Sequence, residues 1–131
     1  MNDREYLAAF ESCALQPGEF HHSDHVRVAW MMLEDGPLEE ALARFSQSLR
    51  RFAAHVGAND LYHQTITWTY LFAINERRQR LAPGHDWPTF EAANPDLFSD
   101  HRGFMGRYYS PELLESNLAK QSYVLPDRAA A

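Results

Sequence analysis

The stretch LEEALARFSQSLRRFAAHV, residues 38–56, decides the fold. Its apolar residues recur at intervals of three and four, the spacing that aligns side chains along one face of an α-helix. They are Leu38, Ala41, Leu42, Phe45, Leu49, Phe52, Ala53 and Val56. The opposite side carries charged and amide groups: Glu39, Glu40, Arg44, Gln47 and Arg51. The pattern predicts an amphipathic helix lying against a helical core, with Gly57 at its end.

Helical patterns continue on the N-terminal side of this stretch. Apolar residues spaced three and four apart predict a short helix from residue 2 to about residue 15, which Pro17 and Gly18 end. We then expect an extended segment, followed by a helix that Ser23 caps and that runs to about Glu34. The chain therefore reaches residue 38 after two predicted helices.

On the C-terminal side, Asn59 or Asp60 is expected to cap a long, mostly apolar helix that ends near Arg80. Beyond Pro83 and Gly84 the pattern weakens into short helical pieces. These pieces are 87–93, 95–98, 102–109 and a helix that restarts at Pro111 after Ser110.

No Val-, Ile- or Thr-rich alternation bounded by turns is present, so no β-sheet is expected. The prediction is an all-α chain, an up-down helical bundle of about four main helices with a C-terminal cover of short helices. Residues 1–131 are expected to form one domain, in which residues 121–131 are an extended or frayed tail.

Composition narrows the class of protein. The net charge of −6 disfavours nucleic acid, and the arginines at 50–51 and 77–80 fall late in predicted helices, where cations complement the helix dipole. Cys13 is the only cysteine, which excludes an internal disulfide. Neither a signal-peptide pattern nor an apolar run able to cross a bilayer is seen, so we expect a cytoplasmic protein that binds no membrane.

Four of the seven histidines gather in two places, His21, His22 and His25 in one stretch and His63 in another. Neutral imidazole is a good ligand for zinc or iron, and three protein ligands with an open position are typical of catalytic sites. Each group begins a predicted helix, whose dipole favours the neutral ring. In an up-down bundle these two helices run parallel, which would bring their first turns to the same end. Spacing alone does not decide between His21 and His22, and each histidine could instead satisfy backbone groups at a helix end.

Polar neighbours of these histidines are candidates for further roles. Asp24 adjoins His25 and is the candidate catalytic group, as a general base on a metal-bound water or as an acceptor for a ring N–H. The alternative is a carboxylate that stabilises a helix N-terminus. Gln64 and Thr67 are candidate substrate-binding groups near His63, although a buried helical threonine often bonds back to its own backbone.

Aromatic and basic side chains supply the other candidate contacts to a small-molecule substrate or ligand. Tyr62, Trp68 and Tyr108 could cover a pocket, and Arg107 could provide a guanidinium for an anionic group. The alternative is that these residues pack as part of amphipathic helices.

Several segments resemble a family of small bacterial proteins that are uncharacterised. They are FHHSDHVRVAW (20–30), YHQTIT (62–67), NPDL (94–97), RYYSP (107–111) and VLPDR (124–128). The resemblance covers nearly the whole chain. In that family a His-x-x-His pair precedes a Tyr-His-Glu-Thr stretch, which corresponds to His22, His25 and His63 and favours His22 over His21. This chain has Gln64 where the family often has Glu, and the resemblance implies no established reaction.

Three functional hypotheses follow. The leading one is a metal-binding helical protein in which His22, His25 and His63 hold a divalent ion, zinc or iron, and which could be an enzyme acting on a small molecule through a metal-bound water. The second is a metal-free module for a small anionic or aromatic ligand. The third is a helical interaction protein or homodimer, suggested by the 3 Trp, 6 Tyr and 8 Phe residues.

Overall fold

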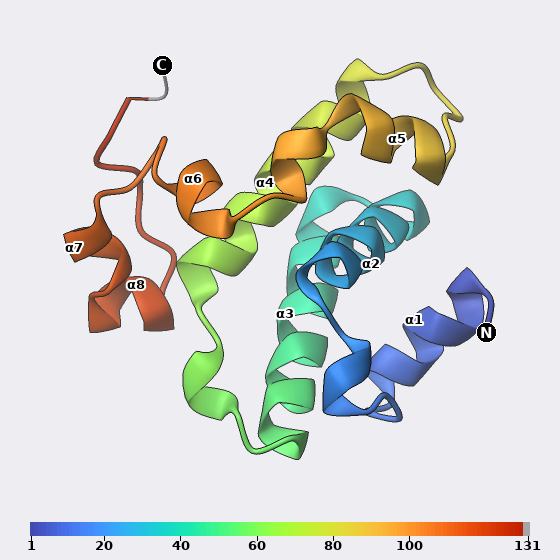
Figure 1. Cartoon of the computed structure of the whole chain (residues 1–131), viewed down its shortest axis with the longest axis horizontal. Coiled ribbons are helices and arrows are strands. Elements are labelled where there is room, and N and C mark those ends of the chain that lie inside the picture. The colour runs from blue at the N-terminus through green and yellow to red at the C-terminus, as the bar shows by residue number, and fades with distance from the viewer. Residues whose placement is uncertain (130–131) are drawn as a thin grey trace. The chain divides into compact units, whose positions relative to one another are not determined.

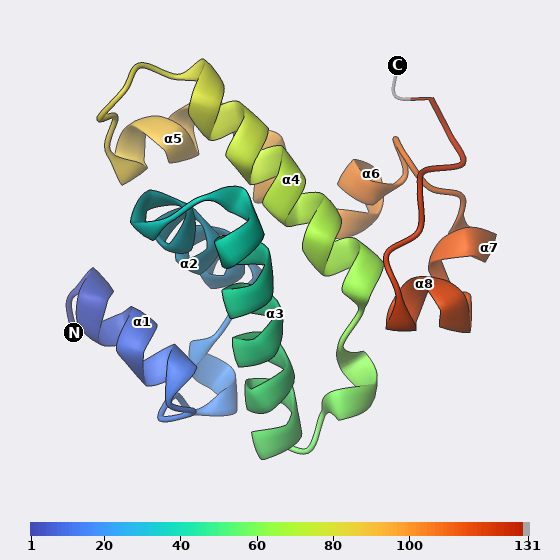
Figure 2. The same cartoon turned by 180° about the vertical axis from the view of Figure 1, so that it is seen from behind.

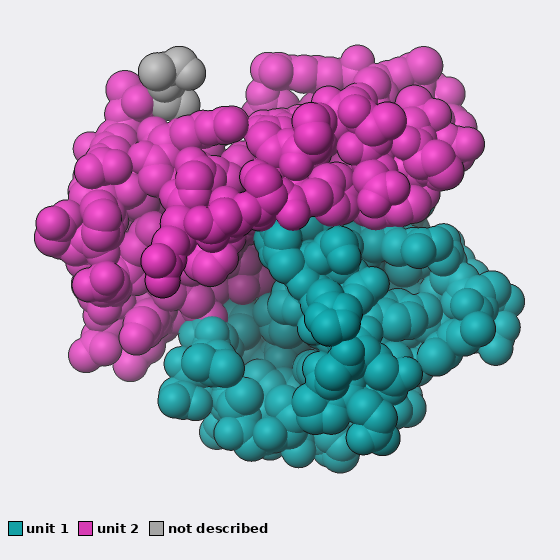
Figure 3. Space-filling view, in the orientation of Figure 1, with its two compact units in different colours: residues 1–62 teal, residues 63–131 magenta. Residues whose placement is uncertain are grey.

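The computed structural model describes residues 1–129, and every regular element in that range is helical. The prediction of an all-α chain with a few main helices followed by short ones is confirmed. The chain divides into two compact units, Met1–Tyr62 and His63–Ala131, which are distinguished by colour in Figure 3. The single-domain expectation stays a prediction, and each unit is described by itself below.

The first unit is built around its longest helix (Figure 1). Its elements are α1 (Asp3–Glu11), η1 (Pro17–Glu19), α2 (His22–Asp35), α3 (Leu38–His55) and η2 (Asn59–Leu61), where η marks a 3₁₀-helix. Both α1 and α2 pack against α3. The amphipathic helix predicted over residues 38–56 is therefore present and lies at the centre of its unit.

Four phenylalanines form the aromatic core of this unit. Phe10 of α1 stacks on Phe20, with ring centroids 4.4 Å apart, and lies 6.0 Å from Phe45 and 5.9 Å from Phe52, both on α3. Phe20 meets Phe52 edge to face at 5.4 Å. Aromatic pairs at such distances stabilise a core beyond the area they bury. They also fix the segment that leads into α2.

A network of ion pairs ties the three helices of the first unit together. Asp35, at the end of α2, accepts hydrogen bonds from Arg4 of α1 at 2.7 and 2.8 Å and from Arg44 of α3 at 3.0 Å. Arg44 also donates to both carboxylate oxygens of Glu11, at 2.6 and 2.8 Å. These guanidinium groups hold the pKa of Asp35 below its usual value.

The second unit consists of one long helix and several short ones (Figure 2). They are α4 (Gln64–Arg80), α5 (Trp87–Ala93), η3 (Pro95–Leu97), α6 (His101–Met105), α7 (Pro111–Leu114) and α8 (Asn117–Gln121). α4 packs against α8, which in turn contacts α7. No helix in the described range is long and apolar enough to cross a membrane.

The segment after α8 is extended, as predicted, but it is anchored rather than frayed. The buried hydroxyl of Thr65 donates to the carbonyl oxygen of Ser122 at 2.9 Å and accepts from the amide of Val124 at 3.2 Å. Tyr109 donates its hydroxyl to the Val124 carbonyl at 2.7 Å. Asp127 accepts from the backbone amide and the hydroxyl of Ser110. The part of the predicted tail at residues 130–131 lies outside the described range.

Two predicted helix starts are wrong. α2 begins at His22, with His21 rather than Ser23 as its N-cap, because the Asp24 carboxylate accepts the His21 amide at 3.0 Å. α4 begins at Gln64, with His63 as its N-cap, and the residues after Asn59 form only a 3₁₀ turn. In both places a less common capping residue replaces the Ser or Asn that capping preferences favour.

Candidate functional site

His22 and His25 lie together on the first turn of α2. They are three residues apart, a spacing that places side chains on the same side of a helix, and their ring centroids are 6.4 Å apart. Both rings are half-buried. The first unit therefore contains a His-x-x-His pair whose members are neighbours in space as well as in sequence.

The ring of His25 lies in an aromatic environment. It stacks on Phe20, with centroids 4.1 Å apart and an angle of 21° between the planes, and Phe45 lies 6.4 Å away. Burial, followed by the proximity of His22, lowers the pKa of His25 to about 4, so the ring is neutral at pH 7. No hydrogen bond joins a His25 ring nitrogen to any residue within the described range. A neutral imidazole nitrogen without a protein partner is able to bind a ligand.

The Asp24 carboxylate has two neighbours within the first unit, the backbone amide of His21 and the hydroxyl of Tyr6. Its carboxylate accepts the backbone amide of His21, which closes the first turn of α2. It also lies near the Tyr6 hydroxyl, whose pKa is raised by burial first and by Asp24 second. That hydroxyl donates to the Glu19 carbonyl at 2.6 Å. The capping role that sequence reasoning kept as an alternative is therefore present, while a role for Asp24 in catalysis stays a prediction.

Both ring nitrogens of His63 are engaged within the second unit. Nδ1 accepts the backbone amide of Ile66 at 3.1 Å, which caps α4. Nε2 lies 2.7 Å from the carbonyl oxygen of Leu114, so it carries the proton and donates it. Burial lowers the pKa of His63 and keeps the ring neutral. In this arrangement His63 offers no lone pair to a metal ion.

Across the described residues, no group of three or more His, Cys, Asp or Glu side chains is placed to hold a metal ion. The ligand set of His22, His25 and His63 therefore lacks structural support. Metal binding itself stays a prediction, and the pair His22 and His25 is the part of the set that the structure brings together.

The predicted substrate-binding residues of the second unit are engaged in local packing. Thr67 donates its hydroxyl to the His63 carbonyl at 2.7 Å, the backbone bond anticipated as its alternative. Trp68 stacks on Tyr123 with centroids 6.0 Å apart. Gln64 is the first residue of α4 and is half-buried.

The remaining predicted contacts are also placed by packing or ion pairing. Tyr62 lies under the guanidinium of Arg50, 4.7 Å from its ring centroid. Arg107 donates to Asp96 at 2.9 Å, and Tyr108 packs edge to face on Phe104. These contacts do not show a ligand site, so the role of these side chains in binding a small molecule stays a prediction.

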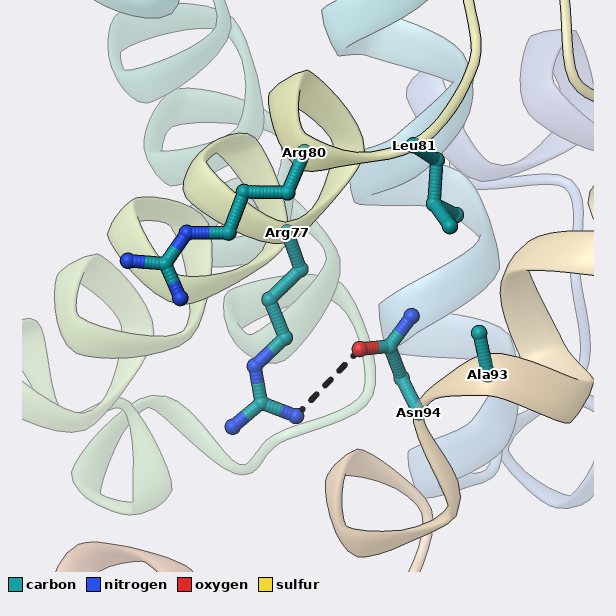
Figure 4. Close-up of a pocket in the computed structure, with 5 residues that line it drawn as sticks. All are labelled: Arg77, Arg80, Leu81, Ala93 and Asn94. Atoms are coloured by element: carbon teal, nitrogen blue, oxygen red, sulfur yellow. Dashed lines mark hydrogen bonds between the residues drawn. The ribbon is translucent and has the colours of Figure 1, made fainter.

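A pocket that sequence reasoning missed lies in the second unit, where α4 ends and α5 meets η3 (Figure 4). It has a volume of about 340 Å³ and is lined by Arg77, Arg80, Leu81, Ala93 and Asn94. The sequence pattern indicates only that these arginines complement the end of a helix. Their nearness to Asn94 depends on how the chain turns back after α4, which local sequence patterns do not reveal.

Comparison with known proteins yields no relative: no family model, no curated protein and no solved structure matches the chain.

Proposed function

We propose that the chain binds a divalent transition-metal ion, zinc or ferrous iron, through His22 and His25. The observation that carries this proposal is the state of the His25 ring, which is neutral because of burial and makes no hydrogen bond to a described residue. Metal ions bind only the neutral imidazole, so protonation of His25 does not compete with binding at pH 7.

Two features of the pair support a shared ion. The two rings lie on the same helical turn with centroids 6.4 Å apart, so that rotation of the side chains can direct one nitrogen of each at a common ion, at a metal–nitrogen bond length of about 2.0–2.1 Å. Stacking on Phe20 and capping of α2 by Asp24 hold the backbone and the His25 ring in place before an ion arrives. Little ordering entropy then opposes binding at His25.

Two protein ligands leave coordination positions open for water or for a small molecule. A bound ion would supply a Lewis acid there, able to lower the pKa of a water molecule or polarise a carbonyl group. A metal-dependent reaction on a small molecule is therefore compatible with the pair. We propose binding rather than a particular reaction, because Asp24 is already engaged with His21 and Tyr6.

Calorimetric titration of the purified full chain with Zn²⁺ and, under anaerobic conditions, Fe²⁺ tests the proposal. We expect one ion per chain, and affinity reduced at least about tenfold in His25→Phe and in His22→Gln. His25→Phe keeps a ring that can stack on Phe20, so loss of binding would not reflect loss of the fold. His55→Gln is the matched control, since His55 is exposed at the end of α3 in the same unit.

Absence of a stoichiometric ion in the wild type, or equal binding by wild type and His25→Phe, would overturn the proposal. If EDTA leaves the Tm unchanged while a small anionic or aromatic compound raises the Tm of the wild type but not of His25→Phe, the metal-free binding module replaces the metal-binding protein.

A further inference from the structure

The pocket of the second unit is lined by positive charge on one side and by apolar groups on the other. Arg77 and Arg80 come from the last turn of α4, and Figure 4 shows Arg77 reaching toward Asn94 while Arg80 leaves the helix in a different direction. Leu81 and Ala93 complete the lining. The pocket belongs to the second unit, whereas the histidine pair belongs to the first.

The guanidinium of Arg77 is held in place by hydrogen bonds to neighbouring side chains. Its Nη1 and Nη2 donate to the two carboxylate oxygens of Asp96 at 2.5 and 2.8 Å, and Nη1 also lies 3.4 Å from the side-chain oxygen of Asn94. The carbon of the guanidinium lies 5.8 Å from the ring centroid of Phe104. Asn94 is itself fixed, because it is buried and donates to the Phe90 carbonyl at 2.9 Å. The group is therefore preorganised, which lowers the entropic cost of binding a ligand.

After these contacts, Arg77 still has a hydrogen-bond donor and positive charge that a ligand could use. A guanidinium has five N–H groups, and the Nε–H of Arg77 makes no hydrogen bond to a residue within the described range. Asp96 is shared with Arg107, which donates to it at 2.9 Å, so one carboxylate faces two guanidinium groups. These two cations lower the pKa of Asp96 to about 2 and keep it ionised. One positive charge remains uncompensated.

Arg80 is the more adaptable of the two cations. Its side chain is 75% exposed and forms an ion pair with Glu76, one turn earlier on α4. Exposed pairs of this kind contribute little to stability, so the guanidinium can exchange Glu76 for a ligand at small cost. A planar fork that meets a carboxylate with two hydrogen bonds is the usual mode of arginine recognition.

We propose that this pocket binds a small organic carboxylate, whose oxygens bridge Arg77 and Arg80 and whose apolar substituent lies on Leu81 and Ala93. The single uncompensated charge matches a monoanion. The volume of about 340 Å³ lies at the lower end of the range for small-molecule sites and suits a carboxylate with a short aliphatic substituent.

Titration of the ¹⁵N-labelled full chain with butyrate at constant ionic strength tests the proposal, with the arginine Nε–H signals as the readout. We expect saturable shifts of the Arg77 and Arg80 signals. The dissociation constant should rise at least about tenfold in Arg80→Gln, the loss expected for a charged hydrogen bond. Acetate should bind several-fold more weakly than butyrate, because it lacks the methylenes that would lie on the apolar wall.

Arg102→Gln is the matched control: Arg102 is exposed on α6 in the same unit and does not line the pocket, so binding should match wild type. Shifts that do not saturate, or that are the same in Arg80→Gln and wild type, would overturn the proposal. Inorganic phosphate binding in place of butyrate would overturn the assignment to a carboxylate. The histidine variants described above leave this pocket intact, so the two proposals fail independently.

Discussion

The His25 ring is kept neutral by its surroundings rather than by a hydrogen bond. Phe20 covers one face at 4.1 Å, and the nearby His22 ring further disfavours a second charge. His63 is neutral for a related reason, but its two nitrogens are used to cap α4 and to hold Leu114. The same residue type therefore serves as a potential ligand in one unit and as a structural connector in the other.

The depressed pKa of His25 predicts how stability depends on pH in metal-free protein. Well above pH 6.5, the ordinary pKa of histidine, the ring is neutral in both the folded and the unfolded state, so the full stability is present. As the pH falls toward 4, the unfolded chain gains a proton that the folded chain resists, and the free energy of unfolding decreases. A shift from 6.5 to about 4 corresponds to about 3 kcal/mol.

Urea unfolding between pH 4 and 7.5 in the presence of EDTA measures this effect. His25→Phe should lose that component of the decline, whereas His55→Gln should follow the wild type. Parallel pH profiles for His25→Phe and wild type would show that the His25 ring is not kept neutral by the fold.

At the level of the elements, the hydroxyl of Thr65 connects α4 to the segment after α8. Thr65 is fully buried and bonds to both Ser122 and Val124. Thr65→Val keeps the shape of the side chain but leaves a backbone carbonyl and an amide without this partner. We expect a loss of about 2–4 kcal/mol in the free energy of unfolding, and faster hydrogen exchange at the Val124 amide.

Thr67→Val is the matched control for that change. Its hydroxyl bonds only to the backbone of the preceding turn, and we expect a loss below about 1 kcal/mol. Equal effects of the two substitutions would mean that the segment after α8 is not anchored through Thr65.

Long periodic elements were predictable from sequence, and their ends were not. The segment 38–56 was identified because its apolar stripe runs over five turns, and α3 covers Leu38–His55. The starts of α2 and α4 were misplaced because histidines occupy the N-cap positions, where Ser, Thr, Asp or Asn is the usual signal. The helix predicted to restart at Pro111 is divided into α7 and α8, because Ser116 begins a new helix by accepting the Ala119 amide.

The candidate sites also differ in how far they were predictable from sequence. The His22 and His25 pair was predictable because it lies within one helical turn. The pocket at Arg77 was not, because its partners Asn94 and Asp96 lie 17 and 19 residues further along the chain. A contact that depends on chain reversal leaves no periodic pattern in the sequence.

At the scale of the whole molecule, the expectation of a single domain predicts one cooperative unfolding transition. The tryptophans make this testable, since Trp30 lies in the first unit and Trp68 and Trp87 lie in the second. A Trp30→Phe variant reports fluorescence from the second unit alone, and a Trp68→Phe/Trp87→Phe variant reports from the first. Their urea midpoints should agree once each is corrected for its own change in total stability, measured by circular dichroism. Two separate midpoints would mean that the units unfold independently.

Metal binding by His22 and His25 is the central claim, and ¹⁵N spectra of the histidine rings test it most directly. On addition of one equivalent of Zn²⁺ to the wild-type chain, we expect one ring nitrogen each of His22 and His25 to change shift, while the nitrogens of the exposed His55 and His101 stay in place. Spectra without a stoichiometric change, or with changes confined to histidines other than these two, would contradict the claim.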